Sequence, residues 1–340
     1  MEILKGKNQM KNIILATIAI LCLGVIGCSE PNGPEGGGFW ERIGKTPYVW
    51  EMAIASNGDI WAGGQDIYLS TDNGNTWINK GSMPYLTSKI AINETNGSVF
   101  VRVSGDQGAA LYRSTNNGEN WEQLLDYFVN DICITLSGEI YIGVDRYIFY
   151  SSDNGDTWIE KSNGLIDTEY RNRMHSIAEG TDGTLYVGTA RGIYRSTDGG
   201  DEWLPPSNHK IYVYNLTVSD DGSIFATAGD SGVFKSTDKG VTWTKIIDKI
   251  IYEIIYNTVT KDIFICNERI PKGANVIISS IVYRSTDLGA SWESINNNGI
   301  PTNSRMITLL AFNPNTGQMY VAVWNNNGSE GVFNGVYRSK

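Results

Sequence analysis

The chain has 340 residues and is acidic, because 37 Asp and Glu outnumber 27 Lys and Arg and give a formal net charge of −10. This balance disfavours nucleic acid as a partner, since phosphate backbones are bound by clustered Lys and Arg. The 38 glycines and 10 tryptophans are typical of a fold rich in turns and aromatic packing.

The first predicted element is a targeting segment. Three lysines within the first eleven residues precede an apolar run of 14 residues, 13–26, which has the length of a signal peptide and is too short for an ordinary membrane span. The run ends in Val-Ile-Gly followed by Cys28. This sequence resembles a bacterial lipobox, which implies cleavage before Cys28 and acylation of that residue. An uncleaved anchor with an incidental cysteine is the alternative, and translation from Met10 would give a more compact signal peptide.

We therefore expect residues 1–27 to be a lipoprotein signal peptide and residues 28–38, which contain Pro and Gly, to be a flexible tether. Ser29, directly after the lipidated residue, favours the outer membrane of a bacterial cell envelope. The side of that membrane, periplasmic or outward, stays open.

An eight-residue phrase then occurs six times, first at 70–77 as Ser-Thr-Asp-Asn-Gly-Asn-Thr-Trp. Its six tryptophans are spaced by 44, 37, 45, 40 and 49 residues. Periods of this size predict four-stranded sheets repeated around an axis, a β-propeller.

The third position of the phrase is an aspartate in five copies: Asp72, Asp153, Asp198, Asp238 and Asp287. Such carboxylates could be catalytic acids or metal ligands. Their recurrence, and Asn116 in the same position of the second copy, favours a structural role in which the side chain accepts backbone N–H groups of its own turn.

Strand-length segments surround each phrase, and we count the four strands of a blade from the inner strand outward. Second strands are predicted at 60–63, 140–143, 185–188 and 224–227. Third strands are predicted at 67–70, 111–114, 193–196, 233–236 and 282–285. Inner strands are predicted at 49–55, 132–135 and 306–312, and no segment predicts a helix. After the sixth phrase, three strands of another blade follow, and the missing outer strand is supplied by 39–43. We therefore expect an all-β, seven-bladed propeller over 39–340, with its last blade closed by the N-terminal strand.

The candidate site is the mouth of the propeller opposite the repeated turns. Six arginines are predicted in or beside the mouth loops: Arg146, Arg171, Arg173, Arg191, Arg269 and Arg305. Guanidinium forks suit carboxylate, sulfate or phosphate groups, and ordinary solvated loop charge is the alternative.

One register of the inner strands is rich in aromatic rings. Its residues are Trp50, Ser88, Asn130, His175, Tyr214, Tyr252 and Ile307. The next register is almost wholly polar, with Glu51, Lys89, Asp131, Ser176, Asn215, Glu253 and Thr308. This pattern fits either a solvated channel wall or a binding site with stacking platforms and polar anchors.

No cofactor or metal is expected. The sequence has no Gly-rich phosphate loop, His-rich cluster or nucleophile elbow, and its only histidines are His175 and His209. Cys133 and Cys266 fall in strands of different blades, and we interpret them as small buried side chains without a disulfide.

The repeated phrase is similar to the Asp-box, or BNR, repeat of sialidases and related propellers. In blade number and spacing, residues 39–340 resemble single seven-bladed propellers of the photosystem II assembly factor type. This resemblance implies a monomeric, non-catalytic scaffold that binds an envelope protein or an acidic glycan.

A glycoside hydrolase is the alternative. Sialidases carry Arg-Ile-Pro ahead of the first box, whereas here that tripeptide lies at 269–271, in the sixth blade. Xyloglucanases of this type use a cleft between two propellers, and this chain has one.

Overall fold

The computed structural model describes residues 39–43, 48–106, 108–165, 173–205, 211–266, 281–295, 299–300, 304–327 and 330–340. Within the last blade, the side chains of 304–306, 308–310, 324–327 and 330–334 are outside the description. The predicted signal peptide and tether, with Cys28, also lie outside the described residues.

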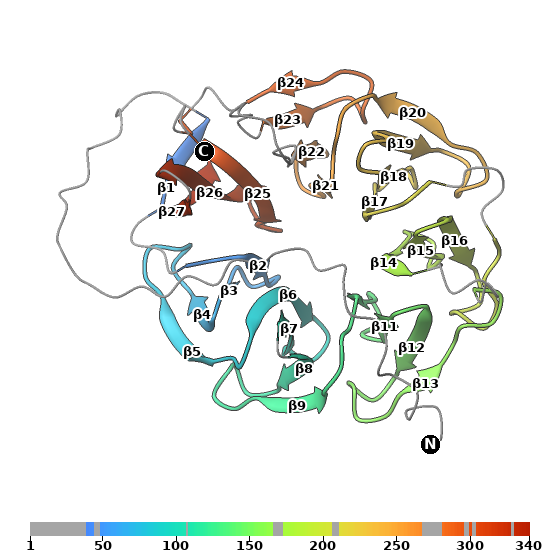
Figure 1. The fold of residues 1–340 in the computed structure, drawn as a ribbon, viewed down its shortest axis with the longest axis horizontal. Coiled ribbons are helices and arrows are strands. Elements are labelled where there is room, and N and C mark those ends of the chain that lie inside the picture. The colour runs from blue at the N-terminus through green and yellow to red at the C-terminus, as the bar shows by residue number, and fades with distance from the viewer. Residues whose placement is uncertain are drawn as a thin grey trace. The chain divides into compact units, whose positions relative to one another are not determined.

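Seven antiparallel sheets form a β-propeller, as predicted (Figure 1). The strands of blades 1 to 3 are β2 (Glu51–Ile54), β3 (Ile60–Gly63), β4 (Asp66–Ser70) and β5 (Ile78–Ser82); β6 (Leu86–Asn93), β7 (Ser98–Gly105), β8 (Gly108–Ser114) and β9 (Glu122–Leu125); and β10 (Asp131–Ile134), β11 (Ile140–Val144), β12 (Tyr147–Ser151) and β13 (Ile159–Glu160). The strands of blades 4 to 6 are β14 (Met174–Glu179), β15 (Leu185–Thr189) and β16 (Gly192–Ser196); β17 (Asn215–Val218), β18 (Ile224–Thr227), β19 (Val233–Ser236) and β20 (Thr244–Ile247); and β21 (Glu253–Tyr256), β22 (Ile263–Cys266), β23 (Val282–Ser285) and β24 (Glu293–Ser294).

Blade 7 joins both ends of the propeller. It contains β25 (Ser304–Phe312), β26 (Met319–Asn327), β27 (Glu330–Ser339) and β1 (Trp40–Arg42), with β1 as the outer strand beside β27. Trp40 pairs with Ser339, and the backbone N–H of Lys340 donates to Phe39 O at 2.9 Å. The predicted closure by the N-terminal strand is confirmed. Pairing with β1 covers the edge of β27 that would otherwise be open.

The hydrophobic core is divided into seven clusters, each lying between two neighbouring blades. The second strand of a blade is buried on both faces; all four residues of β3 are buried, for example. Inner strands contact their neighbours in order around the ring, from β2 through β25 and back to β2. Stability is therefore spread over the interfaces between blades.

The two cysteines of the propeller differ in burial. Cys266 is buried between blades 6 and 7, and its thiol donates to Ile307 O at 2.9 Å. Cys133 is half-buried and lies on the inner strand β10, whereas Cys266 lies on a second strand that is buried throughout.

Each repeated turn is held by hydrogen bonds of its own side chains. In the first, Asp72 Oδ1 accepts the Thr76 N–H at 2.8 Å, and Ser70 Oγ accepts the Gly74 N–H at 2.8 Å. These bonds, led by the Thr76 hydroxyl, lower the pKa of Asp72 to about 2. Gly74 has φ of 85°, a conformation that glycine adopts at little cost. Asn116 accepts the equivalent N–H from Asn120 at 3.0 Å, so an amide can replace the carboxylate in this turn.

Basic side chains link each repeated turn to the preceding blade. In the turns of blades 3, 5, 6 and 1, the carbonyls at one equivalent position accept from such side chains: Asn154 from Arg113, Lys239 from Arg195, Leu288 from Lys235 and Asn73 from Arg338. The blade that follows blade 6 has no such turn. Arg284 of blade 6 instead pairs with Asp262 at 2.8 Å and lies over the ring of Phe39.

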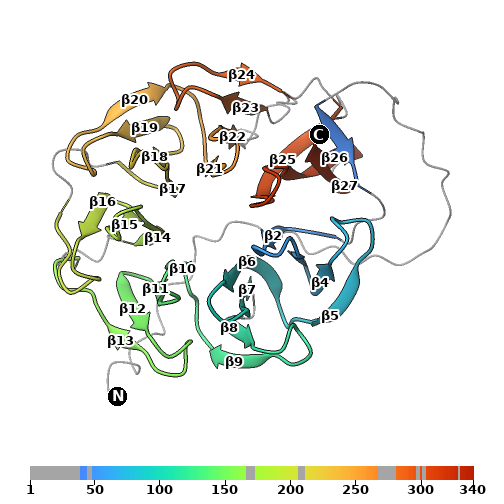
Figure 2. The same ribbon diagram turned by 180° about the vertical axis from the view of Figure 1, so that it is seen from behind.

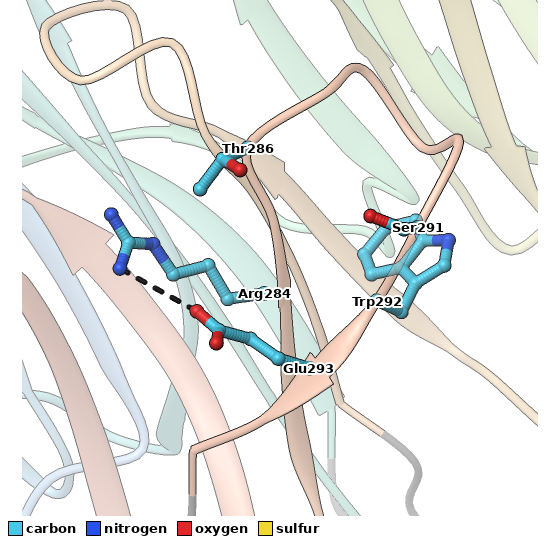
Figure 3. Close-up of a pocket in the computed structure, with 5 residues that line it drawn as sticks. All are labelled: Arg284, Thr286, Ser291, Trp292 and Glu293. Atoms are coloured by element: carbon cyan, nitrogen blue, oxygen red, sulfur yellow. Dashed lines mark ion pairs between the residues drawn. The ribbon is translucent and has the colours of Figure 1, made fainter.

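A small surface hollow of about 170 Å³ lies beside Arg284 in blade 6. It is lined by Arg284, Thr286, Ser291, Trp292 and Glu293 (Figure 3). Because the Arg284 guanidinium is engaged by Asp262 and Glu293, the hollow belongs to the framework. No helix in the described part of the chain is long and apolar enough to cross a membrane.

Candidate functional site

The two ends of the propeller are chemically different. In an antiparallel blade, the turn between the first two strands and the repeated turn lie at one end. The turn between the second and third strands, and the connection to the next blade, lie at the other end, which we call the mouth face (Figure 2).

Exposed aromatic side chains gather at the mouth face. Five aromatic residues in the described part of the chain are both large and well exposed, between 38% and 48%: Tyr48, Tyr127, Phe128, Tyr212 and Tyr214. All five lie on connections that lead into an inner strand. The other exposed large apolar residues described are aliphatic. Solvent-exposed rings concentrated on one end of a protein indicate a binding surface.

Four rings of blades 4 to 6 pack against one another, and we call them the aromatic quartet: His175, Tyr212, Tyr214 and Tyr252. Tyr212 lies between His175 and Tyr214, with ring centroids 4.6 and 4.7 Å apart. Tyr252 meets Tyr214 edge-on at 4.7 Å. Val213 is fully buried between the two exposed tyrosines, so strand alternation directs both of their rings away from the core.

The local backbone explains the position of His175. It is the unpaired residue where the β14–β15 register shifts between Met174 and Ser176. An unpaired residue of this kind bends a strand and redirects a side chain, here toward the tyrosines. Burial, and secondarily Arg173, lowers the pKa of His175 to about 4, so the ring is neutral at pH 7.

Arg173 stands beside the aromatic quartet on the connection into β14. Its carbonyl accepts the Ala190 N–H at 2.9 Å, which ties its backbone to the neighbouring turn. Its exposed guanidinium lies over the ring of Phe128, 5.4 Å from the centroid. Arg102 lies 5.8 Å from the same centroid, so Phe128 contacts two guanidinium groups.

A charged cluster lies on blades 1 to 3. Glu51, Lys89 and Asp131 are on the inner strands β2, β6 and β10, and Arg102 is on the second strand β7. Lys89 Nζ lies 3.5 Å from Asp131 Oδ1. Arg102 donates to Ser88 O at 3.0 Å and to Val129 O at 3.3 Å, which ties blade 2 to blade 3. Asp131 accepts the Ile177 N–H at 3.0 Å and ties blade 3 to blade 4. Much of this cluster therefore stabilises the ring.

Glu51 is the carboxyl group of this cluster whose pKa is raised. Burial raises the pKa of Glu51 to about 7, while Lys89 and Arg102 oppose the shift and Asp131 adds to it. A carboxyl group with this pKa can donate or accept a proton near neutral pH. Asp131, in contrast, raises the pKa of Lys89.

The predicted arginines have different positions. Arg173 joins the aromatic quartet, whereas Arg146 donates to Tyr147 Oη of its own hairpin at 3.0 Å. Arg191 lies on the β15–β16 turn, where its N–H donates to Thr189 Oγ1 at 3.0 Å. Arg171, Arg269 and the side chain of Arg305 lie outside the described residues.

Three residues of the predicted register are equivalent in the sheets. The N–H groups of Trp50, Asn130 and Tyr214 donate to equivalent carbonyls of the second strands, whereas His175 is the unpaired residue of a register shift. Trp50 packs edge-on against Tyr48 at 5.8 Å.

Sequence reasoning missed Tyr48, Tyr127, Phe128, Tyr212 and Arg102. The tyrosines and Phe128 could have been found as aromatic residues just before an inner strand. Arg102 is on a second strand and lies in the cluster because it pairs with Lys89 of the inner strand. This pairing can be recognised only when the register between the two strands is known.

Comparison with known proteins shows the fold alone. No protein-family model matches the sequence, and no curated protein matches it. Among the part of the chain that is described, no three His, Cys, Asp or Glu side chains gather in a way that could hold a metal ion.

Three solved propellers illustrate the range of functions on this fold. The GH74 enzyme of Niastella koreensis matches with a TM-score of 0.64 and 16% identity over 87% of this chain and 55% of the enzyme. YCF48 bound to a D1 peptide matches with a TM-score of 0.63 and 15% identity over 90% of this chain and 96% of that chain. Virginiamycin B lyase from Staphylococcus aureus, with quinupristin, matches with a TM-score of 0.62 and 14% identity over 88% of this chain and 98% of the lyase.

The present chain thus spans about half the length of the GH74 enzyme that it matches. All these identities are low. The shared feature is the seven-bladed β-propeller, which carries both enzymes and a peptide-binding protein.

Proposed function

We propose that the protein is a non-catalytic binding module of the bacterial envelope, and that its mouth face binds an envelope protein or an acidic glycan. The observation that carries this proposal is the placement of the exposed aromatic residues, all five of which lie on the mouth face in the described part of the chain. Rings of this size supply much of the contact energy in sugar and protein recognition.

The chemistry beside these rings supports the proposal. Arg173 presents a guanidinium at the aromatic quartet, and the Asn215 amide follows Tyr214 at the start of β17. Rings with a few polar groups between them fix both the position and the orientation of a ligand. YCF48, which shares the fold, is described with a bound peptide, and this is consistent with a binding role.

The membrane anchor on Cys28 is part of the same proposal and rests on the lipobox-like sequence. Acylation at that residue, followed by a tether of about ten residues, would hold a monomeric propeller near the membrane surface. Envelope glycans and proteins are then the ligands within reach.

The test is an array of envelope proteins and of neutral and acidic glycans, probed with the wild type and a Tyr212→Ala/Tyr214→Ala variant. Loss of two stacking rings should weaken binding at least tenfold, about 1.4 kcal/mol. The matched control is Leu136→Ala/Val259→Ala, which removes two exposed apolar side chains from the opposite end of the propeller. Binding that depends on the control pair and not on the tyrosines would refute the assignment to the mouth face.

A glycoside hydrolase is the second candidate, because Glu51 and Asp131 share one charged cluster and the pKa of Glu51 is about 7. Glycoside hydrolysis uses two carboxyl groups, one of which has a raised pKa. Hydrolysis of any glycan on the array, abolished by Glu51→Gln, would favour this candidate over the binding module.

A further inference from the structure

We infer that the mouth face binds a hexuronate-containing glycan, with a sugar ring on the exposed tyrosines of the aromatic quartet and its carboxylate on Arg173. This inference rests on the proposed function and names the chemical class of its ligand. It depends on the juxtaposition of one exposed guanidinium and one group of neutral rings.

Arg173 is a cation whose backbone is held in place by the neighbouring turn. Its backbone is anchored through Ala190, and one face of its guanidinium is covered by Phe128. Among the described residues, the guanidinium takes part in no hydrogen bond or ion pair, unlike those of Arg113 and Arg284. Stacking on a ring leaves the in-plane N–H groups of arginine available, and these form the fork that binds a carboxylate through two parallel bonds.

The neighbouring rings are on a connection that is hydrogen-bonded to the same turn as Arg173. The N–H of Val213, between Tyr212 and Tyr214, donates to Thr189 O at 3.0 Å, and the N–H of the next turn residue, Ala190, donates to Arg173 O at 2.9 Å. The cation of Arg173 also contributes to lowering the pKa of His175 and opposes the rise in the pKa of Tyr212. Tyr212 and Tyr214 are about two-fifths exposed, and the His175 ring packs against both, with centroids 4.6 and 6.1 Å away. An apolar sugar face can therefore lie on the tyrosines within reach of the guanidinium.

The arrangement favours an acidic sugar over an acidic peptide. In a hexuronate the carboxylate is attached to the same rigid ring that stacks. A single sugar unit can therefore contact the tyrosines with its ring and Arg173 with its carboxylate. A peptide carboxylate is carried on a flexible side chain without an accompanying flat face, and its ordering costs conformational entropy. The protein itself has a large negative net charge, so Arg173 also provides local attraction for an anion that the rest of the surface repels.

The experiment uses three hexuronate polymers, polygalacturonate, alginate and hyaluronan, measured by calorimetric titration against the full-length protein. Fully methyl-esterified polygalacturonate is the matched neutral ligand, and poly-glutamate is the acidic peptide. We expect at least one hexuronate to bind at least tenfold more tightly than the ester and poly-glutamate. Arg173→Gln should weaken that binding at least tenfold, with Arg173→Lys between the two, because lysine keeps the charge and loses the fork.

Lys261→Gln is the charge-matched control, since it removes one positive charge from the opposite end of the propeller. Circular dichroism on each variant separates lost binding from lost folding. Equal affinity for the acid and its ester, or binding that Arg173→Gln leaves unchanged, would overturn the inference. Binding of poly-glutamate or of the ester alone, with loss in the Tyr212→Ala/Tyr214→Ala variant, would overturn it and leave the proposed function standing. Binding of no ligand in this set would also overturn it, and the array of envelope proteins and glycans would then judge the proposed function separately.

Discussion

Replacing Trp40 with alanine tests whether the N-terminal strand is part of the cooperative fold. Trp40 lies on β1 and is 2% exposed, within the cluster between blades 6 and 7. Its indole N–H donates to Ile295 O at 3.2 Å, which joins the N-terminal strand to blade 6. The side chain thus holds the seam at which the propeller closes.

The magnitude follows from these contacts. Truncation of a buried tryptophan to alanine costs about 3–5 kcal/mol, and loss of a hydrogen bond adds about 1 kcal/mol. The expected loss of about 4–6 kcal/mol is comparable with the whole stability of many domains, about 5–15 kcal/mol. The variant should therefore unfold at a much lower urea concentration.

Urea unfolding followed by far-ultraviolet circular dichroism measures this loss. The control is Glu41→Ala on the same strand, where the ion pair with Arg338 is partly exposed and worth less than about 1 kcal/mol. A loss below about 2 kcal/mol for Trp40→Ala, or equal losses for the two variants, would refute the cooperative closure of blade 7.

Three further predictions follow from single side chains. Asp72→Asn should reduce the fall in melting temperature between pH 4 and pH 2. The pKa of Asp72 is held at about 2, so the stability that its carboxylate contributes is present above pH 4 and is lost as the pH falls toward 2. An equal fall in melting temperature for wild type and variant would contradict this. Glu51→Gln should raise the melting temperature at pH 8 and not at pH 4, because a folded-state pKa of about 7, above the ordinary 4.5, means that stability is lost as the pH rises through 7. An equal gain at both pH values would show that ionisation is not the cause. Cys28→Ala should move the protein to the soluble fraction or leave the precursor uncleaved, and a lipid-labelled membrane protein in the variant would exclude acylation at that residue.

Most of the fold could be predicted because each blade repeats the same local chemistry. The turn residues, the second strands such as 60–63 and the strand at 39–43 are local patterns. The six repeats indicate six blades, and the strand segments after the last repeat, together with 39–43, give the seventh. The inner-strand register was also predictable, since Trp50 and Tyr214 occupy equivalent positions before their strands.

The candidate site was less predictable because it depends on contacts between blades. The sequence indicates arginines in mouth loops, but it does not distinguish Arg146, which contacts its own hairpin, from Arg173, which lies by the aromatic quartet. The packing of Tyr212 between His175 and Tyr214 joins residues on two blades. Similarly, the pKa of Glu51 depends on charges from two other blades.

The most direct test of the central claim is a hydrogen-exchange footprint of the protein with the tightest ligand found on the array. If the mouth face is the binding surface, amides of 126–132 and 211–216 should exchange more slowly in the complex, because these segments carry Tyr127, Phe128, Tyr212 and Tyr214. The repeated turns at 71–77 and 237–243 should be unaffected, since they lie at the opposite end of the propeller. Protection confined to those turns, with the mouth segments unchanged, would contradict the account.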